Sequence, residues 1–307
     1  MDAIHIDPDF DDQQRRAVLF DGQLIAYPAR PSIQAFVDFT RSLVEEAFRP
    51  LDPEAAQEQM PVEEYANLLK ELKPTFIHHA RSKELIRGLL VDFGCDPERT
   101  YFDVPRLRTS TSGGYLTTGI AYAFHPHRDT WYSAPFAQQN WWLPVYPVMR
   151  ENVVAFHPQY WEEPVRNGSR EYNYAIWNAT SRKEAASQIG VDTRQQPKAE
   201  QEVQLEPQIR PVPPVGGVMV FSGSQLHSSV PNTSGRTRIS IDFRVVNRDD
   251  VETGNGAPNI DSECTGTTLG DFLRISDLEP LPADLVQSFD TPPHGDPAPV
   301  GTGGSAE

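Results

Sequence analysis

Cysteine is nearly absent from this chain, which has 2 cysteines among 307 residues. Cys95 and Cys264 lie far apart and form no closely spaced pair of the kind that binds zinc. We interpret both as free thiols in a reducing compartment, so a structural disulfide is not expected. A chain of this length buries ~75% of its unfolded surface on folding and does not need a disulfide to be stable.

Long apolar runs are also missing. No stretch approaches the ~18 consecutive apolar residues that indicate a membrane-spanning helix. The start, Met1 to His5, is acidic and lacks the positive and apolar regions of a secretion signal. We therefore expect a soluble, cytoplasmic protein that does not act at a membrane.

Positive charge is scarce, because 27 Lys and Arg stand against 43 Asp and Glu, giving a net charge of −16. Such a field repels the phosphates of nucleic acid, which is therefore not an expected partner. We interpret the excess of acidic residues as a surface property that keeps the protein soluble. A cleft can still carry the opposite sign, so a small-molecule substrate with an anionic group remains open.

What the sequence does contain is a change of pattern near residue 100. Before it, apolar residues recur at helical spacing over 32–48, 65–72 and 85–93, and Pro74 is expected to end the second helix. After it, short β-rich runs separated by Gly, Pro and Asn predict an antiparallel barrel or sandwich. The expected strands are 115–124, 141–148, 153–156, 172–177, 218–221 and 237–246.

These patterns divide the chain into regions and predict a mainly β fold with flanking helices. A helical N-terminal region over 1–100 is expected to pack on a β core over 101–250. A polar insertion over 180–214 interrupts that core and is typical of a lid or surface excursion. A C-terminal extension covers 251–290, and the Pro-, Gly- and Ala-rich tail over 291–307 is expected to be disordered.

The residues that carry chemistry are His127, Asp129 and His227. In an extended strand, residues separated by one position project from the same face, so His127 and Asp129 are expected to point to a common place. His227 follows the expected strand 218–221 and can complete the set from a neighbouring strand. Two imidazoles and one carboxylate form a three-sided ligand set that suits Fe(II) and leaves other coordination positions open.

Arg238 and Ser240 are candidates for binding a cosubstrate beside the metal. An arginine fork matches a carboxylate with two parallel hydrogen bonds, so Arg238 can anchor the far carboxylate of a keto-acid cosubstrate. Ser240, on the same face of the expected strand, can add a hydroxyl donor. Arg236 and Arg244 share the alternation phase of Arg238, so periodicity leaves all three arginines open for this role.

The chain at this point resembles the iron(II)/2-oxoglutarate-dependent dioxygenases. The H-x-D motif at 127–129 and the stretch from His227 to Arg238, HSSVPNTSGRTR, are similar to motifs of the phytanoyl-CoA hydroxylase-like branch. The similarity covers about 101–246. It implies a double-stranded β-helix core, a jelly-roll or cupin-like barrel, with Fe(II), 2-oxoglutarate and dioxygen as cofactors.

The same resemblance implies site residues and a reaction. His127, Asp129 and His227 would be the catalytic iron ligands, and Arg238 with Ser240 would hold 2-oxoglutarate. Family members often place a further polar residue near the cosubstrate, for which Asn140 and Gln139 are candidates. The expected reaction is oxidation of an unactivated C–H bond of a small metabolite by hydroxylation, desaturation or ring closure. The substrate class suggested is amino-acid-derived, within specialised natural product biosynthesis.

The sequence also bears on two alternative functions. Halogenases of this family replace the ligand carboxylate with a small residue, so Asp129 disfavours halogenation. Gly119, followed later by His125-x-His127, fits the start of a cupin motif, which would make the chain a non-catalytic or 2-oxoglutarate-independent metal- or small-molecule-binding barrel. The glutamate that a cupin ligand set requires after His127 is missing from the expected place.

Overall fold

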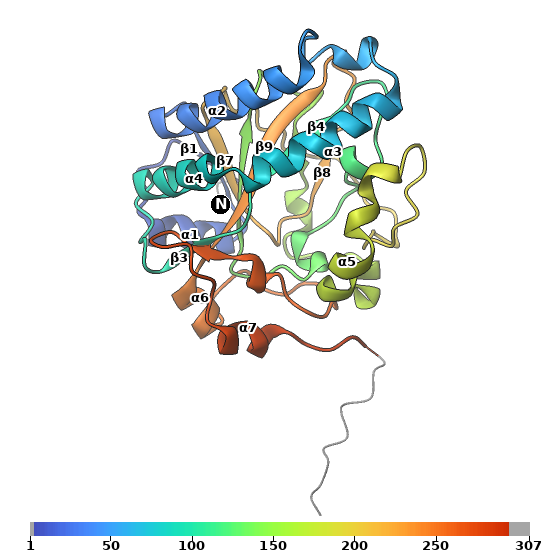
Figure 1. The fold of residues 1–307 in the computed structure, drawn as a ribbon. Coiled ribbons are helices and arrows are strands. Elements are labelled where there is room, and N and C mark those ends of the chain that lie inside the picture. Colours follow the sequence, from blue (N-terminus) through green and yellow to red (C-terminus); the bar gives the residue numbers. More distant parts are fainter. Residues whose placement is uncertain (1–2, 295–307) are drawn as a thin grey trace, which may run out of the picture.

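The computed structural model describes residues 3–294 of the chain (Figure 1). The α-helices are α1 (Asp12–Phe20), α2 (Pro31–Phe48), α3 (Val62–His78), α4 (Ala80–Asp92), α5 (Tyr174–Thr180), α6 (Arg248–Thr253) and α7 (Ala283–Phe289). Short 3-10 helices occupy Ala56–Glu58 (η1), Gly119–Ala121 (η2), Asp129–Tyr132 (η3), Pro158–Tyr160 (η4), Gly168–Glu171 (η5), Arg182–Ser187 (η6) and Leu269–Asp271 (η7).

A large sheet and a two-stranded sheet form the β structure. The strands are β1 (Ile4–Ile6), β2 (Leu24–Tyr27), β3 (Thr100–Phe102), β4 (Arg106–Ser110), β5 (Gln139–Pro144), β6 (Val154–Phe156), β7 (Val218–Ser222), β8 (His227–Ser229), β9 (Arg238–Asn247) and β10 (Leu273–Arg274). The large sheet has the order β1-β2-β7-β5-β9-β3-β10, with β4 also paired to β9, and β6 pairs with β8. The pair β1–β2 is parallel, and the other named pairs are antiparallel. The sheet is therefore mixed, with flanking helices.

The two faces of the large sheet bury different partners. Trp141, Val220 and Phe243 point toward α2, α3 and α4 and share one apolar cluster with them, and Figure 1 shows these helices gathered over the sheet. Trp142 and Phe221, each one residue along the same strands, pack instead with residues of β6. This alternation follows from the period of two in a strand. The second face, which we call the inner face, looks toward β6 and β8.

The expected helices are confirmed, with one correction. Apolar stripes on α2, α3 and α4 are buried against the sheet, as their spacing predicts. The prediction that Pro74 ends the second helix is wrong, because α3 continues to His78 with Pro74 inside it. Leu72 and Phe76 on either side are buried in the core, and this packing outweighs the local cost of proline. The first hundred residues also provide β1 and β2 of the large sheet.

Two expected strands are wrong. The segment 115–124 contains the 3-10 helix η2 instead of a strand, and 172–177 leads into α5. The side chain of Asn173 accepts a hydrogen bond from the backbone N–H of Ile176, at 3.1 Å, and so caps α5. The expected strands in 141–148, 153–156, 218–221 and 237–246 correspond to β5, β6, β7 and β9.

The polar segment over 180–214 contains η6 and otherwise irregular structure, and it lies against η2. Gly119 N–H donates to the Asp192 carboxylate at 3.1 Å, and Thr118 Oγ1 donates to Gln188 O at 2.7 Å. No helix within residues 3–294 is long and apolar enough to cross a bilayer. Of the expected disordered tail, 295–307 lies outside the described residues.

Candidate metal centre

His127, Asp129 and His227 come together at one point. One ligand atom of each lies within 4.8 Å of the others. Asp129 Oδ1 lies 3.5 Å from His127 Nε2 and 3.9 Å from His227 Nε2. Two imidazole nitrogens and one carboxylate oxygen at these separations can bind a single ion at about 2 Å from each. The donor set fits Fe(II), as expected from the sequence.

The backbone brings the two histidines side by side. His127 N–H donates to His227 O, and His227 N–H donates to His127 O, both at 2.9 Å, so an isolated antiparallel bridge joins 127 to the first residue of β8. Asp129 instead begins η3, and its N–H donates to Gly223 O at 2.8 Å. The prediction of one continuous strand through 127 and 129 is therefore wrong, although the two side chains still converge.

Each imidazole is oriented by a backbone carbonyl. Nδ1–H of His127 donates to His125 O at 2.8 Å, and Nδ1–H of His227 donates to Gln225 O at 2.9 Å. These contacts assign the proton to Nδ1 and leave Nε2 as the ligand atom. Burial and the neighbouring His127 lower the pKa of His227 to about 4, so this ring is neutral at physiological pH, as a metal ligand requires.

Two side-chain amides hold the carboxylate of Asp129. Asn140 Nδ2 donates to Asp129 Oδ2 at 2.8 Å, and Gln138 Nε2 donates to the same oxygen at 3.0 Å. Burial alone would raise the pKa of Asp129, but its contacts with the side chains of His127 and His227 and the charge of Arg244 hold it well below its ordinary value. The carboxylate is therefore ionised, with Oδ1 turned toward the histidines. Sequence reasoning missed Gln138, which lies just before β5 and two residues before Asn140.

Arg238 and Ser240 lie on the inner face at the start of β9. Arg238 is buried, its Nη1 donates to Asn152 O at 3.0 Å, and its guanidinium lies 5.6 Å from the centre of the Trp142 ring. Within the described residues, Arg238 Nε and Ser240 Oγ are buried without a hydrogen-bond partner. Burial lowers the pKa of Arg238 to about 10, and the side chain stays charged at neutral pH. These unused donors suit a carboxylate.

The competing arginines are already paired with carboxylates of the protein. Arg236 is exposed at the surface and pairs with Glu54 at 3.1 Å. Arg244 lies on the inner face beside Asn140 and pairs with Asp103 at 2.6 Å. Gln139 lies opposite Val245, which packs in the cluster on the helix-covered face, so it points away from Asn140 and the inner face.

Other residues of the H-x-D region have structural contacts. The buried Arg128 donates to both oxygens of Asp261, at 3.1 and 3.0 Å, and also to backbone carbonyls. Asp261 additionally accepts from Trp131 Nε1 at 2.7 Å and from Val165 N–H at 2.9 Å. The C-terminal extension therefore fixes the loop that presents two metal ligands. His125, which the cupin alternative required as the first histidine of its motif, is exposed and lies outside the ligand cluster.

Aromatic rings surround the centre. Phe124 stacks on His127 with ring centres 4.9 Å apart, and Tyr132 meets the same imidazole edge-on at 5.5 Å. Tyr172 in turn packs on Tyr132 at 5.4 Å. The aromatic side chains at 124, 132 and 172 therefore provide an apolar wall next to the ligand set.

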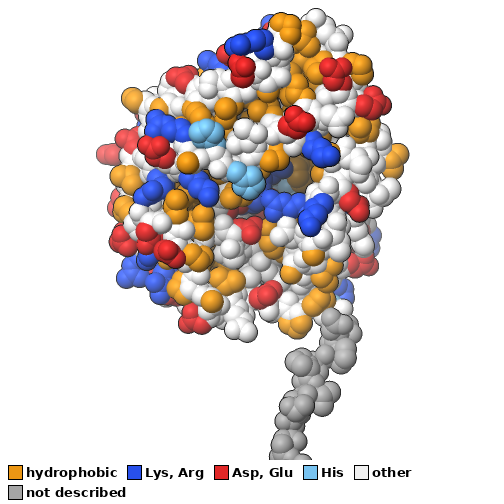
Figure 2. Space-filling model, in the orientation of Figure 1, with side chains coloured by type: hydrophobic (Ala, Val, Ile, Leu, Met, Phe, Trp, Pro, Cys, Tyr) orange, Lys and Arg blue, Asp and Glu red, His pale blue; other side chains and the backbone are white. Residues whose placement is uncertain are grey.

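The inner face beside the metal centre is partly open to solvent. Four charged side chains there remain between 17% and 33% exposed although they project between the two sheets: Arg106, Arg108, Asp242 and Arg244. Figure 2 shows a hollow in the surface with Lys and Arg side chains at its margin. A small molecule can therefore approach the centre from solvent.

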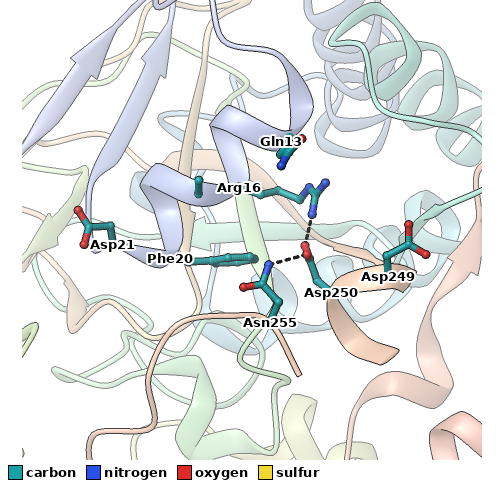
Figure 3. Close-up of a pocket in the computed structure, with 8 residues that line it drawn as sticks. Gln13, Arg16, Phe20, Asp21, Asp249, Asp250 and Asn255 are labelled. Carbon is teal, nitrogen blue, oxygen red and sulfur yellow. Dashed lines mark hydrogen bonds and ion pairs between the residues drawn. The ribbon is translucent and has the colours of Figure 1, made fainter. Parts of the chain in front are cut away.

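A cavity of about 550 Å³ lies between α1 and α6 (Figure 3). None of the three candidate metal ligands lines it. Asp250 accepts hydrogen bonds there from Arg16 and, at 2.7 Å, from Asn255 Nδ2. Phe20 lines the same cavity. These polar groups pair with one another.

No protein-family model matches the chain, and no curated protein matches it in sequence. Among solved structures, EvdO2 from Micromonospora carbonacea var. aurantiaca complexed with 2-oxoglutarate is 13% identical over 78% of this chain and 92% of that chain, with a TM-score of 0.44. The epimerase SnoN with Fe3+, alpha ketoglutarate and nogalamycin RO is 12% identical over 77% and 85%, with a TM-score of 0.38. AviO1 from Streptomyces viridochromogenes Tue57 is 14% identical over 76% and 95%, with a TM-score of 0.36. Similarity this low does not decide what the present chain does.

Proposed function

We propose that this protein is an Fe(II)- and 2-oxoglutarate-dependent oxygenase with a double-stranded β-helix core, of the phytanoyl-CoA hydroxylase-like branch. The observation that carries the proposal is the convergence of His127, Asp129 and His227, each with its ligand atom aimed and its other polar atom held by a hydrogen bond. This arrangement occupies one side of an ion and leaves the opposite side open.

The side chains at the centre would have separate roles. His127, Asp129 and His227 would bind the iron, while Asn140 and Gln138 keep the carboxylate of Asp129 turned toward it. We propose this positioning role for Asn140 in place of cosubstrate binding, because its amide is already engaged by Asp129 and Gln138. Iron bound here with 2-oxoglutarate and dioxygen would supply the oxidising power to attack an unactivated C–H bond.

Arg238 and Ser240 would hold the distal carboxylate of 2-oxoglutarate, since their donors lie on the inner face without protein partners among the described residues. Phe124 and Tyr132 limit water at the centre. The substrate would be a small metabolite in specialised biosynthesis, oxidised by hydroxylation, desaturation or ring closure.

The test is an anaerobic titration of the purified protein with Fe(II) and 2-oxoglutarate, which should produce a weak visible charge-transfer band. His127→Ala should abolish it. Arg238→Ala should weaken 2-oxoglutarate binding about 100-fold, as expected for about 2.7 kcal/mol from a charge-assisted bidentate contact, with iron binding retained.

Arg236→Ala is the matched control, because Arg236 lies nearby in sequence but pairs at the surface with Glu54. If the wild-type protein binds iron without ever giving the band, or if Arg236→Ala weakens 2-oxoglutarate binding as much as Arg238→Ala does, the proposed function or its cosubstrate site is wrong.

A further inference from the structure

Cationic side chains outnumber carboxylates around the inner face of the sheet. The positive residues are Arg106, Arg108, Arg238 and Arg244; the acids are Asp103, Asp129 and Asp242. A bound Fe(II) ion and a 2-oxoglutarate dianion would cancel each other's charge. A positive excess would then remain in a chain whose overall charge is −16.

The excess is concentrated at Arg106 and Arg244, which share one carboxylate. Asp103 Oδ2 accepts from Nη1 of Arg106 at 2.5 Å and from Nη1 of Arg244 at 2.6 Å. Its other oxygen accepts from the backbone N–H of Arg244 at 2.7 Å. Within the described residues, Nε and Nη2 of both arginines make no hydrogen bond. By contrast, Arg108 is paired with Asp242 through two nitrogens.

The arginine pair lies beside the metal centre. Arg244 is the cross-strand neighbour of Asn140, whose amide donates to Asp129. Such neighbours stand about 5 Å apart at Cβ. Both arginine side chains keep 17% of their surface exposed to solvent. An anion held by this pair would therefore sit next to the iron.

We propose that Arg106 and Arg244 bind a carboxylate of the substrate, which is therefore a small organic acid. The inference rests on the proposed function. Two guanidinium groups and one aspartate leave a single positive charge, which matches a monoanionic carboxylate better than a phosphate dianion. Two N–H groups that converge on a carboxylate give the strong form of the hydrogen bond. The aromatic wall of Phe124, Tyr132 and Tyr172 would contact the rest of the molecule.

The pKa of Arg106 is consistent with an anion site at this arginine pair. Burial, and then repulsion from Arg244, lowers it from the ordinary value, despite the opposing effect of Asp103. An incoming carboxylate would relieve that repulsion.

The test uses three probes that share one ring: benzoate, benzamide and phenyl phosphate. Each is titrated anaerobically into the protein loaded with Fe(II) and 2-oxoglutarate, and binding is followed by perturbation of the charge-transfer band. Benzoate should bind at least about tenfold more tightly than benzamide, as expected for one charge-assisted contact. Arg106→Gln should remove that preference, Arg106→Lys should restore part of it, and Arg236→Gln should leave it unchanged.

Equal binding of benzoate and benzamide, binding of neither, tighter binding of phenyl phosphate, or an undiminished preference in Arg106→Gln would each overturn the proposal. Calorimetric titration of the metal-free protein with the same probes tests the arginine pair without iron. A missing band together with Arg106-dependent benzoate binding would therefore count against the proposed function and not against the anion site.

Discussion

The hydrogen bonds that aim Asp129 give the sharpest prediction. Removing the Asn140 amide by Asn140→Ala takes away the 2.8 Å contact to Asp129 Oδ2 but leaves the 3.0 Å contact from Gln138. Loss of a group that orients a metal ligand typically costs about 10- to 100-fold in metal affinity. Because Gln138 remains, we expect the lower end, about tenfold or 1.4 kcal/mol, for the single variant. The double variant Asn140→Ala/Gln138→Ala should reach about 100-fold.

The assay is an anaerobic competition between the protein and a chromophoric chelator for Fe(II). The matched control is Asn255→Ala, which removes the same kind of amide-to-carboxylate bond, at 2.7 Å to Asp250, in the cavity of Figure 3. It should leave iron affinity unchanged. Wild-type affinity in the double variant, with the fold intact by circular dichroism, would refute the positioning role.

The other predictions concern stability and docking. Asp261→Ala leaves Arg128 buried without its counter-charge and should cost about 3–5 kcal/mol in urea unfolding, whereas Glu263→Ala, which breaks only the exposed pair with Arg170, should cost at most about 1 kcal/mol. Lys73 has its pKa lowered from 10.5 to about 7, chiefly by burial, so the unfolded chain binds the extra proton between these values. Unfolding free energy of the wild type relative to Lys73→Met should therefore rise with pH from about 7 to 10.5, and a flat difference would contradict this. Gly119→Ala places a Cβ against Ala185 O and 2.6 Å from Gln188 O, at a φ of +58° that favours glycine. The variant should loosen the contact between η2 and the segment 180–200 and speed proteolysis within that segment. Unchanged cleavage would show that Gly119 is not needed to hold the segment in place.

Periodicity predicted the helices α2, α3 and α4 and the strands β5, β6, β7 and β9, because burial of one face leaves a repeating pattern of apolar residues in the sequence. Sequence reasoning gave the wrong element where local hydrogen bonding or packing opposed the pattern. The aromatic run 172–177 suggests a strand, but the amide of Asn173 caps a helix there. Pro74 suggests a helix end, but the apolar residues around it continue the buried face of α3.

The candidate site was likewise predictable only in part from the sequence. The spacing of His127, Asp129 and His227 predicted that they come together, and the three ligand atoms do lie within 4.8 Å. Alternation alone could not separate Arg238 from Arg244, because both project from the same strand face. Only the position of Asp103, held against β9 by a backbone contact to Arg244, distinguishes them. The role of Asn140 likewise depends on its distance from Asp129, which no linear pattern contains.

The ion pair between Arg128 and Asp261 has a consequence for how the protein is made. The two residues are 133 positions apart, and the later one secures the loop that carries His127 and Asp129. During synthesis from the N-terminus, every ligand is already in the chain before that anchor emerges. Tight iron uptake should therefore wait until the chain has been synthesised past residue 261, and a nascent chain ending before 261 would hold all three ligands yet load the metal poorly.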